Sequence, residues 1–464
     1  MEKKRGSFSG SLGFVLAAAG SAVGLGNIWR FPYLAAKDGG GLFLLVYIIL
    51  ALTFGFALLT TEIAIGRKTG QSPLVAYGML HQKWKWIGPL ASLIPIIILP
   101  YYCVIGGWIL KYLATYLTGN AAQAITDGYF TGFITAQTEP IVWFVVFLAA
   151  TAAVIIMGVD KGIERLSKVL MPVLVVLVLG IAIFSLTLSH TDEATGVTRT
   201  GLQGLAVYII PNFDGLTFGK LATVLMDAMG QLFYSISVAM GIMITYGSYV
   251  KKDANLVQSV NRIEIFDTAV AFLAGLMIIP AVFTFMGMEG MNSGPSLMFV
   301  SLPKVFNAMG GAGIVVAIIF FIMVVFAALT SSVSLMETVA SCFMDRFHIS
   351  RRIATLVTFL LSLVLGLIVC LGYNVFYFEL ALPNGSVAQV LDVMDYLSNY
   401  VLMPVVAIAT CLLIGWVVKP KTVIDEVTLG GFKFGRQKLY VVMVKFVTPV
   451  MLLFLLLQSF GLIK

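Results

Sequence analysis

The sequence predicts an all-α polytopic membrane protein, and three observations lead to that fold class. Of the 464 residues, 59% are hydrophobic and 11% are charged, and the mean hydropathy is +1.00. A soluble domain carries about 25% charged residues, so the composition excludes a cytosolic enzyme, a disordered regulator and a nucleic-acid binder. Apolar runs of about 20 residues, the length of a spanning helix, recur along the chain. They lack the ten-residue alternation of a transmembrane β-barrel.

Eleven apolar runs are the predicted spans of one transmembrane domain over residues 1–464. Short glycine-rich connections, such as that at residues 39–41, favour helical hairpins in lipid. The runs lie near residues 11–36, 41–65, 88–116, 141–158, 166–187, 220–247, 262–287, 311–344, 352–373, 390–417 and 439–461.

Lys and Arg in the connections predict a cytoplasmic N-terminus and an extracellular C-terminus in the plasma (inner) membrane. With that orientation the inner segments hold 21 of them and the outer segments 6, and the other 2 of the 29 lie within spans. The net charge of +7 suits cytoplasmic loops beside anionic lipid better than a nucleic-acid partner. The basic N-terminus resembles a signal peptide, but the apolar run continues through Asn27 and Arg30, so we expect no cleavage.

Two spans are predicted to break near mid-membrane. The first reads GSAVGLGN over residues 20–27, and the sixth reads QLFYSISVAMG over residues 231–241. Such a pair, five helices apart, indicates a transporter with inverted repeats and a midplane site. We expect repeats at 11–187 (spans 1–5) and 220–417 (spans 6–10), with discontinuous spans 1 and 6 and an eleventh helix at 439–461. Close packing of helices through small residues is the alternative.

Polar residues inside other spans add a second prediction. In the eighth span, Thr330 and Ser331 follow Ala327 by three and four residues, which places two hydroxyls beside one carbonyl. Hard alkali cations bind such neutral oxygens, although hydroxyls also back-bond to carbonyls in ordinary helices. Several carboxylates also fall within spans. We expect Glu62, Asp227 and Glu337 to bind backbone amides, Asp392 or Asp395 to meet Arg30, and Cys103, Cys342, Cys370 and Cys411 to form neither disulfides nor a metal cluster.

The first break carries a long motif. Residues 24–33 read GLGNIWRFPY, which strongly resembles the signature of the neurotransmitter:sodium symporters. Similar segments follow in the family's order at 245–249 (TYGSY), 329–332 (LTSS) and 392–395 (DVMD). Eleven spans resemble the bacterial amino-acid transporter branch. The resemblance implies sodium-driven amino-acid uptake by alternating access, with two Na⁺ sites and no organic cofactor.

The resemblance also implies the residues of each site. One sodium would bind the carbonyls of Gly20, Val23 and Ala327 and the hydroxyls of Thr330 and Ser331, and the other would bind Ala22, Asn27, Ser235, Asp267 and the substrate carboxylate. The substrate would contact Ala22, Gly24, Leu25, Gly26, Ile98, Tyr102, Tyr234, Ser235, Ser237, Met240, Ser331 and Leu335. Arg30 with Asp395 would form the outer gate, Arg5 with Asp345 the inner gate beside Ser248 and Tyr249, and Gly162 with Pro172 a cytoplasmic unwinding element.

Two departures from the family pattern carry a further expectation. Asp267 stands where many members have Asn, and Ala271 stands where chloride-dependent members use Ser. Glycine at position 24, where amine carriers have an acid, favours an amino-acid substrate. We therefore expect chloride-independent transport, proton countertransport through Asp267, and hydrophobic or aromatic L-amino acids as substrates.

Two other classes are weighed against transport. An ion channel would show symmetric pore-lining motifs, which the sequence lacks. A membrane enzyme would show HExxH or a nucleophile–base set, and the three histidines form no such motif. The protein is therefore not expected to be an enzyme, and its preferred amino acid and oligomeric state stay open.

Overall fold

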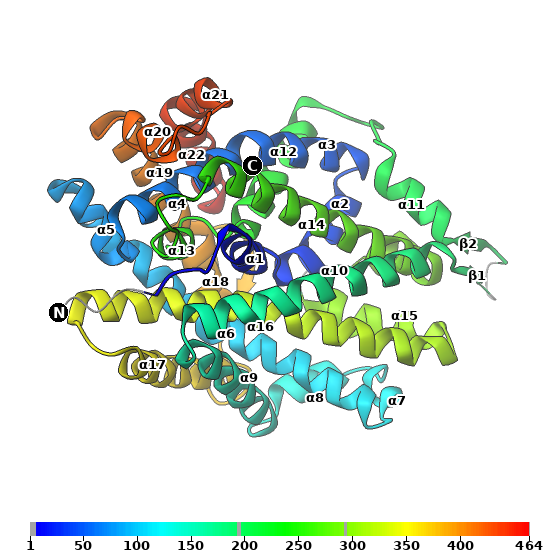
Figure 1. The fold of residues 1–464 in the computed structure, drawn as a ribbon. Helices are drawn as coiled ribbons and strands as arrows, with labels where there is room; N and C mark the ends of the chain where they lie inside the picture. Colours follow the sequence, from blue (N-terminus) through cyan, green and yellow to red (C-terminus); the bar gives the residue numbers. More distant parts are fainter. Residues whose placement is uncertain (1–5, 193–195, 292–294, 464) are drawn as a thin grey trace.

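A computed structural model describes residues 6–192, 196–291 and 295–463. Long helices run side by side between two ends of the molecule (Figure 1). The N-terminus, α5, α13 and α20 lie at one end, here called the N-terminal face, and β1, β2 and α7 lie at the other, the opposite face. The helices therefore cross the molecule in alternating directions.

All eleven predicted spans are helical in the described residues. Nine helices are long and apolar enough to cross a membrane. A tenth span is a bent pair, α1 (Ser11–Ala22) followed by Gly26–Lys37, with 56° between its halves. The sixth predicted span consists of α12 (Phe218–Ser235) and the short α13 (Ile242–Gly247). The nine are Gly41–Thr69, Gln82–Leu117, Glu139–Ile156, Val159–Leu186, Leu256–Met286, Gly311–Phe347, Arg351–Leu371, Val390–Val417 and Gln437–Ser459.

Several spans contain π-helical turns, and short elements connect them. The helices within the spans are η1 (Gly26–Arg30), α2 (Phe31–Lys37), α3 (Gly41–Leu50), η2 (Ala51–Gly55), α4 (Phe56–Thr69), α6 (Ile87–Leu117), α9 (Glu139–Ile156), η4 (Val159–Glu164), α10 (Arg165–Leu186), α14 (Leu256–Met286), α16 (Gly311–Phe347), α17 (Arg351–Leu371), α18 (Val390–Asp395), η7 (Tyr396–Leu402), α19 (Met403–Leu412), η8 (Leu413–Val417), α21 (Gln437–Val442), η9 (Met443–Val447) and α22 (Thr448–Ser459). The connecting elements are α5 (Pro73–Leu80), η3 (Gln82–Trp84), α7 (Ala121–Ala124), α8 (Tyr129–Thr135), the antiparallel β1 (Ser189–Thr191) and β2 (Thr198–Thr200), α11 (Gly201–Ile209), η5 (Met288–Gly290), η6 (Leu297–Ser301), α15 (Leu302–Ala308), the antiparallel β3 (Leu380–Ala381) and β4 (Val387–Ala388), and α20 (Lys421–Val427).

Both predicted helix breaks are confirmed. Residues 23–25 separate the halves of the first span, and residues 236–241 leave the sixth span without helix. Ser237 and Ala239 adopt φ of 54° and 64°, a left-handed conformation that is costly for a residue with a side chain. The buried Glu62 carboxylate on α4 accepts a 2.6 Å hydrogen bond from the Ala239 amide and so holds this backbone in place.

Small residues also pack the helices closely, as the alternative interpretation expected. An added Cβ on Gly20 of α1 would lie 3.3 Å from Cβ of Thr330 on α16 and 3.0 Å from the Met171 sulfur on α10. Such close approach lets α1 pack against α10, α14 and α16 in the middle of the molecule (Figure 1).

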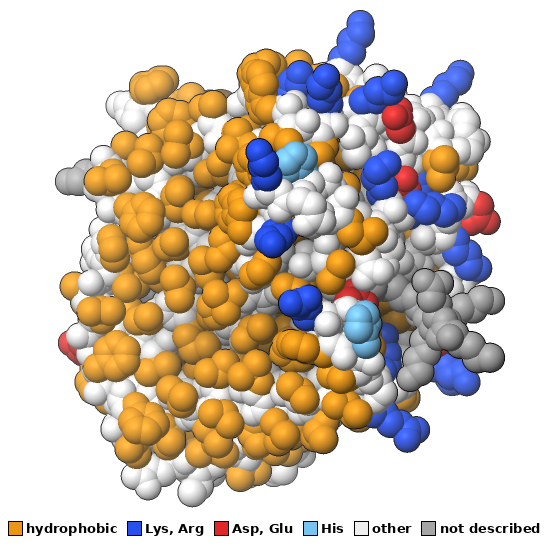
Figure 2. Space-filling view, turned by 90° about the vertical axis from the view of Figure 1, so that its left-hand side faces the viewer, with side chains coloured by type: hydrophobic (Ala, Val, Ile, Leu, Met, Phe, Trp, Pro, Cys, Tyr) orange, Lys and Arg blue, Asp and Glu red, His pale blue; other side chains and the backbone are white. Residues whose placement is uncertain are grey.

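The surface is that of a multi-pass membrane protein. Figure 2 shows a broad area of apolar side chains beside an end where Lys and Arg gather. On α17, the exposed Ile353, Leu356, Leu360 and Val364 recur at helical spacing, which gives the helix a lipid-facing side.

The carboxylates within spans only partly follow the sequence prediction. Glu62 does bind a backbone amide. The expectation was wrong for Asp227 and Glu337, which pair instead with cationic side chains: Lys37 at 2.8 Å and Arg351 at 2.6 Å. The four cysteines are buried and free, as expected.

Candidate functional site

A cavity of about 30 Å³ lies between the two helix breaks. Its walls come from α1, η1, α6, α12, α16 and the non-helical part of the sixth span. All twelve residues predicted to contact a substrate line it, together with Ser21, Asn27 and Ile242: they are Ala22, Gly24, Leu25, Gly26, Ile98, Tyr102, Tyr234, Ser235, Ser237, Met240, Ser331 and Leu335.

Two glycines bring the first-span backbone to the cavity wall. A Cβ on Gly24 would lie 2.9 Å from both the Ser331 and the Tyr102 hydroxyls, and a Cβ on Gly26 would lie 2.8 Å from the Tyr234 ring. The Leu25 amide between them donates to the Tyr102 hydroxyl at 3.3 Å. The break therefore brings the Leu25 amide and the Tyr102 phenol together at the cavity wall, and both are donors that suit a carboxylate.

Asp267, fully buried on α14, binds two residues of the cavity wall. Its Oδ1 accepts from Asn27 Nδ2 at 2.9 Å and from Ser235 Oγ at 2.8 Å. Ser235 Oγ also lies 2.9 Å from Asn27 Oδ1. Asp267 Oδ2 is buried without a hydrogen-bond partner among the described residues. A buried carboxylate oxygen with no hydrogen-bond donor is a suitable ligand for a cation.

A second group of oxygens surrounds Ser331 of α16. Its hydroxyl lies 3.4, 3.1 and 3.5 Å from the carbonyl oxygens of Gly20, Ser21 and Val23. The Thr330 hydroxyl lies 3.1 Å from the Ala327 carbonyl. Thr330 also lies 3.0 Å from the Phe326 carbonyl, so back-bonding and cation binding are both compatible with its position. The five predicted ligands therefore lie at one contact between α1 and α16.

The outer gate does not form its predicted ion pair. Between Arg30 and Asp395, both among the described residues, there is no contact within ion-pair distance; instead Asp395 Oδ1 accepts from Tyr101 at 3.1 Å and Asn399 at 2.6 Å. The Arg30 guanidinium lies 5.8 Å from the centre of the Tyr400 ring. The Asp395 carboxylate is thus bonded to neutral donors, and Arg30 lines a separate cavity of about 520 Å³.

The N-terminal face is closed by the start of the chain. Phe8 is buried, its amide donates to the Tyr249 carbonyl at 3.1 Å, and its ring packs against Tyr246 and Tyr249. Of the predicted inner gate, Arg5 lies outside the described residues, and Asp345 Oδ2 accepts from the Ser72 amide at 2.6 Å.

The predicted unwinding element is helical here. Gly162 lies in the π-helical η4 and Pro172 in α10, directly after the Met171 that contacts Gly20. Its unwinding stays a prediction.

Three side chains near the site were not assigned to it from the sequence. Glu62 was read as structural, yet it fixes the break of the sixth span. Gln231 donates to the Gly26 carbonyl at 3.1 Å and so joins the two broken spans. Tyr47, on α3, places a buried hydroxyl without a hydrogen-bond partner near Asp267. In the sequence, these three side chains stand out only as polar residues within apolar runs. Their partners lie on distant spans, so the sequence could not identify them.

A bent first span, an unwound sixth span and a cavity between them lined by both polar and apolar side chains are typical of a secondary transporter. The chain belongs to the sodium:neurotransmitter symporter family, whose sequence profile matches residues 5–131 and 131–464. It is thus a multi-pass membrane protein of a class that couples small-molecule transport to sodium.

Relatives span the chain almost completely. An uncharacterized sodium-dependent transporter of Bacillus subtilis, YhdH, is 32% identical over 100% of this chain and 99% of its own. The human sodium- and chloride-dependent GABA transporter 2 is 27% identical over 82% of this chain and 71% of its own. The crystal structure of MhsT in complex with L-phenylalanine superposes with a TM-score of 0.85 and 36% identity, covering 98% of this chain and 100% of that one.

Proposed function

We propose that the protein is a sodium:amino-acid symporter that takes up hydrophobic or aromatic L-amino acids by alternating access. The observation that carries this proposal is the cavity between the two helix breaks, whose wall includes Leu25, Gly26, Asn27 and Ser235, the last two of which also bind the buried Asp267 carboxylate. The L-phenylalanine bound in the similar MhsT structure supports an aromatic substrate.

The first sodium is assigned to Asp267, Asn27, Ser235 and the Ala22 carbonyl. A zwitterionic substrate would add its carboxylate to this shell, because the Leu25 and Gly26 amides lie on the same cavity wall. Each ligand then raises the affinity for the other, which couples ion and substrate thermodynamically.

The second sodium is assigned to the oxygens where α1 meets α16. Its ligands would be the Gly20, Val23 and Ala327 carbonyls with the Thr330 and Ser331 hydroxyls. A cation there joins the first and eighth spans and favours the state that is open to the outside. Unwinding of α10 around Pro172 would move Met171 away from Gly20 and admit water to this ion.

The substrate side chain would face Ile98, Tyr234, Met240 and Leu335. The cavity of about 30 Å³ holds one or two water molecules, so these walls must separate when an amino acid enters. Met is well suited to such a wall because its side chain adapts to varied shapes.

Chloride independence and proton countertransport follow from Asp267. Its carboxylate supplies within the protein the negative charge that a bound chloride would otherwise bring, and Ala271 offers no hydroxyl for an anion. When the sodium leaves, a proton would take its place on this carboxylate. The proton would return outward with the empty carrier.

The two repeats, at residues 11–187 and 220–417, would rock about the cavity with the N-terminus in the cytoplasm. In that orientation Arg30 and Asp395 approach on the outer side as the outer gate closes, and Phe8, Tyr249 and Asp345 close the inner side.

Uptake into proteoliposomes tests the function. We expect saturable uptake of labelled leucine, tyrosine or tryptophan that requires an inward Na⁺ gradient, with glycine and alanine as weak competitors. Na⁺-independent flux without saturation would instead indicate a channel, and chemical conversion of the amino acid would indicate an enzyme.

A further inference from the structure

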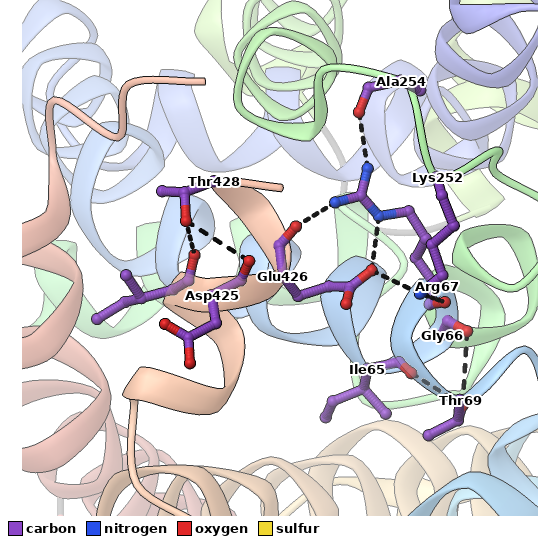
Figure 3. A network of polar contacts seen from close by, with 10 residues as sticks. Ile65, Gly66, Arg67, Thr69, Lys252, Ala254, Asp425, Glu426 and Thr428 are labelled. Atoms are coloured by element: carbon purple, nitrogen blue, oxygen red, sulfur yellow. Dashed lines mark hydrogen bonds and ion pairs between the residues drawn. The ribbon is translucent and has the colours of Figure 1, made fainter. Parts of the chain in front are cut away.

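At the N-terminal face, the connection between the tenth and eleventh spans is fastened to two other parts of the chain. Arg67, at the end of α4, has a fully buried side chain. Its Nε donates to Glu426 Oε1 of α20 at 2.9 Å, its Nη2 donates to the Glu426 carbonyl, and its Nη1 donates to the Ala254 carbonyl at 2.7 Å (Figure 3).

Lys252 completes this junction, here called the Arg67 junction and defined by Arg67, Lys252, Ala254 and Glu426. The Lys252 ammonium donates to the Arg67 carbonyl at 2.8 Å and to Glu426 Oε1 at 2.9 Å. One Glu426 oxygen therefore binds both cations, and three segments far apart in sequence meet there: α4, residues 252–254 and α20 (Figure 3).

The segment that the junction fixes is the one that closes the N-terminal face. Three residues before Lys252, the Tyr249 carbonyl accepts from the Phe8 amide. The intervening Lys251 donates to the Ser9 carbonyl at 3.3 Å. Residues 249–254 thus bind the start of the chain at one end and the Arg67 junction at the other.

The junction also bears on the sixth span through α4. An added Cβ on Gly66, adjacent to Arg67, would lie 2.0 Å from the Ile244 carbonyl of α13. One turn earlier on α4, Glu62 holds the Ala239 amide. If the end of α4 moved, both α13 and the non-helical residues beside the cavity would therefore move with it.

We propose that Glu426 is a positioning residue for transport, and that α20 braces the closed inner side through the Arg67 junction. The proposal rests on the alternating access proposed above. Glu426 touches neither sodium nor substrate. Its carboxylate neutralises a guanidinium that the protein has removed from water, and losing one partner of such a pair is strongly destabilising to the arrangement that contains it. Without the Glu426 carboxylate, residues 249–254 and the segment around Phe8 should detach from the N-terminal face more often.

Accessibility of the inner side tests this inference without substrate. Thr245 on α13 is fully buried, and its hydroxyl faces Ser341. A Thr245→Cys reporter in inside-out vesicles would be labelled with a membrane-impermeant maleimide, and labelling of the same variants without the reporter is subtracted. We expect Glu426→Gln to raise the labelling rate about 5-fold or more, and Glu426→Asp to restore a rate near the parent's.

Asp425 provides the matched control. It is the adjacent acidic residue on α20, it is exposed, and its side chain points away from Arg67 (Figure 3). Asp425→Asn removes the same charge and should leave labelling and uptake unchanged. Lys252→Gln removes one cation from the exposed side of the junction and should raise labelling less than Glu426→Gln does.

Folding is checked by the melting temperature and by a monodisperse elution profile. If Glu426→Gln does not fold, Lys252→Gln decides the question. The inference is overturned if the folded variants label no faster than Asp425→Asn. Absence of Na⁺-dependent uptake by the parent protein would overturn the proposed function instead. Labelling therefore tests the role of the Arg67 junction, and uptake tests the proposed function independently.

Discussion

Ser331 has one hydrogen to donate, but three carbonyl oxygens lie within 3.5 Å of its hydroxyl. The Ser21 carbonyl also accepts from Ser237 Oγ at 3.0 Å, so Ser331 has one hydrogen for the Gly20 and Val23 carbonyls, and a cation between them could be shared by both. From residue type and spacing alone, the sequence predicted only that the Thr330 and Ser331 hydroxyls lie beside the Ala327 carbonyl, and cation binding there stays a prediction. The meeting with Gly20 and Val23, more than 300 positions away, could come only from the family resemblance, because helix periodicity says nothing about which helices touch.

Removing the hydroxyls of Thr330 and Ser331 should therefore weaken sodium binding. We expect Thr330→Ala with Ser331→Ala to raise the Na⁺ concentration for half-maximal uptake roughly 10- to 100-fold, the range typical of lost metal-site contacts. Thr338→Ala is the control, since its buried hydroxyl bonds only to the Ser334 carbonyl in the described structure. An unchanged Na⁺ dependence in the double variant would remove the sodium assignment.

Asp267 supports a prediction about chloride. Replacing external chloride with gluconate should leave uptake by the parent unchanged, because the carboxylate is permanently in the site. Asp267→Asn with Ala271→Ser replaces that charge with a hydroxyl one turn along α14. Uptake by this double variant should be stimulated by chloride, with Ala271→Ser alone as control. Loss of parent activity in gluconate would contradict the argument.

At the scale of elements, helices and breaks were predictable where local composition decides them. Apolar runs predicted all eleven helical segments, and stretches that mix small and polar residues predicted both breaks. The predicted start of the fifth span at residue 166 was late, because a π-helical turn with charged residues begins it at Val159. Short polar helices such as α20 carry no apolar signal of their own; they are held by partners such as Arg67 on distant helices.

The α10 helix carries its own prediction. Pro172 has no amide to donate to the Lys168 carbonyl, so Pro172→Ala should stabilise the helix and slow Na⁺ release. Turnover should fall severalfold while binding affinity holds, as measured by uptake and equilibrium binding. Gly162→Ala is a poor probe, since its Cβ would meet the Val154 carbonyl at 2.2 Å. Pro280→Ala on α14 is the control, and an unaltered turnover in Pro172→Ala would contradict unwinding.

The connection between α2 and α3 predicts a pH effect. Burial raises the pKa of Asp38 from 3.8 to about 7, and the nearby Asp227 adds to the rise. The folded state then binds more protons than the unfolded chain between about pH 4 and 7, so stability falls as pH rises through this window. Asp38→Asn should remove that fall and raise the melting temperature at pH 8 on the order of 2 °C, but not at pH 4. Asp214→Asn, exposed, should do neither.

At the scale of the whole molecule, the same charges that orient the chain also line one end of it. Lys and Arg gather beside the apolar surface in Figure 2, and the long spans that carry them alternate in direction through the molecule. The sequence predicts this asymmetry because each connection's charge is local. It does not predict that α4, α20 and residues 252–254 converge there, since that depends on how eleven helices pack together.

The orientation decides which way the sodium gradient drives the substrate, so it is tested directly. Asn384 and Lys433 are exposed in connections on opposite sides of the tenth span. With 21 Lys and Arg on the inner segments against 6 outside, we expect Asn384→Cys to react with an impermeant maleimide in intact cells and Lys433→Cys to react only after permeabilisation. The native cysteines are buried, and the parent protein measures their background. The reverse pattern would place the Phe8 closure and the Arg67 junction on the outer side and would contradict the proposed orientation.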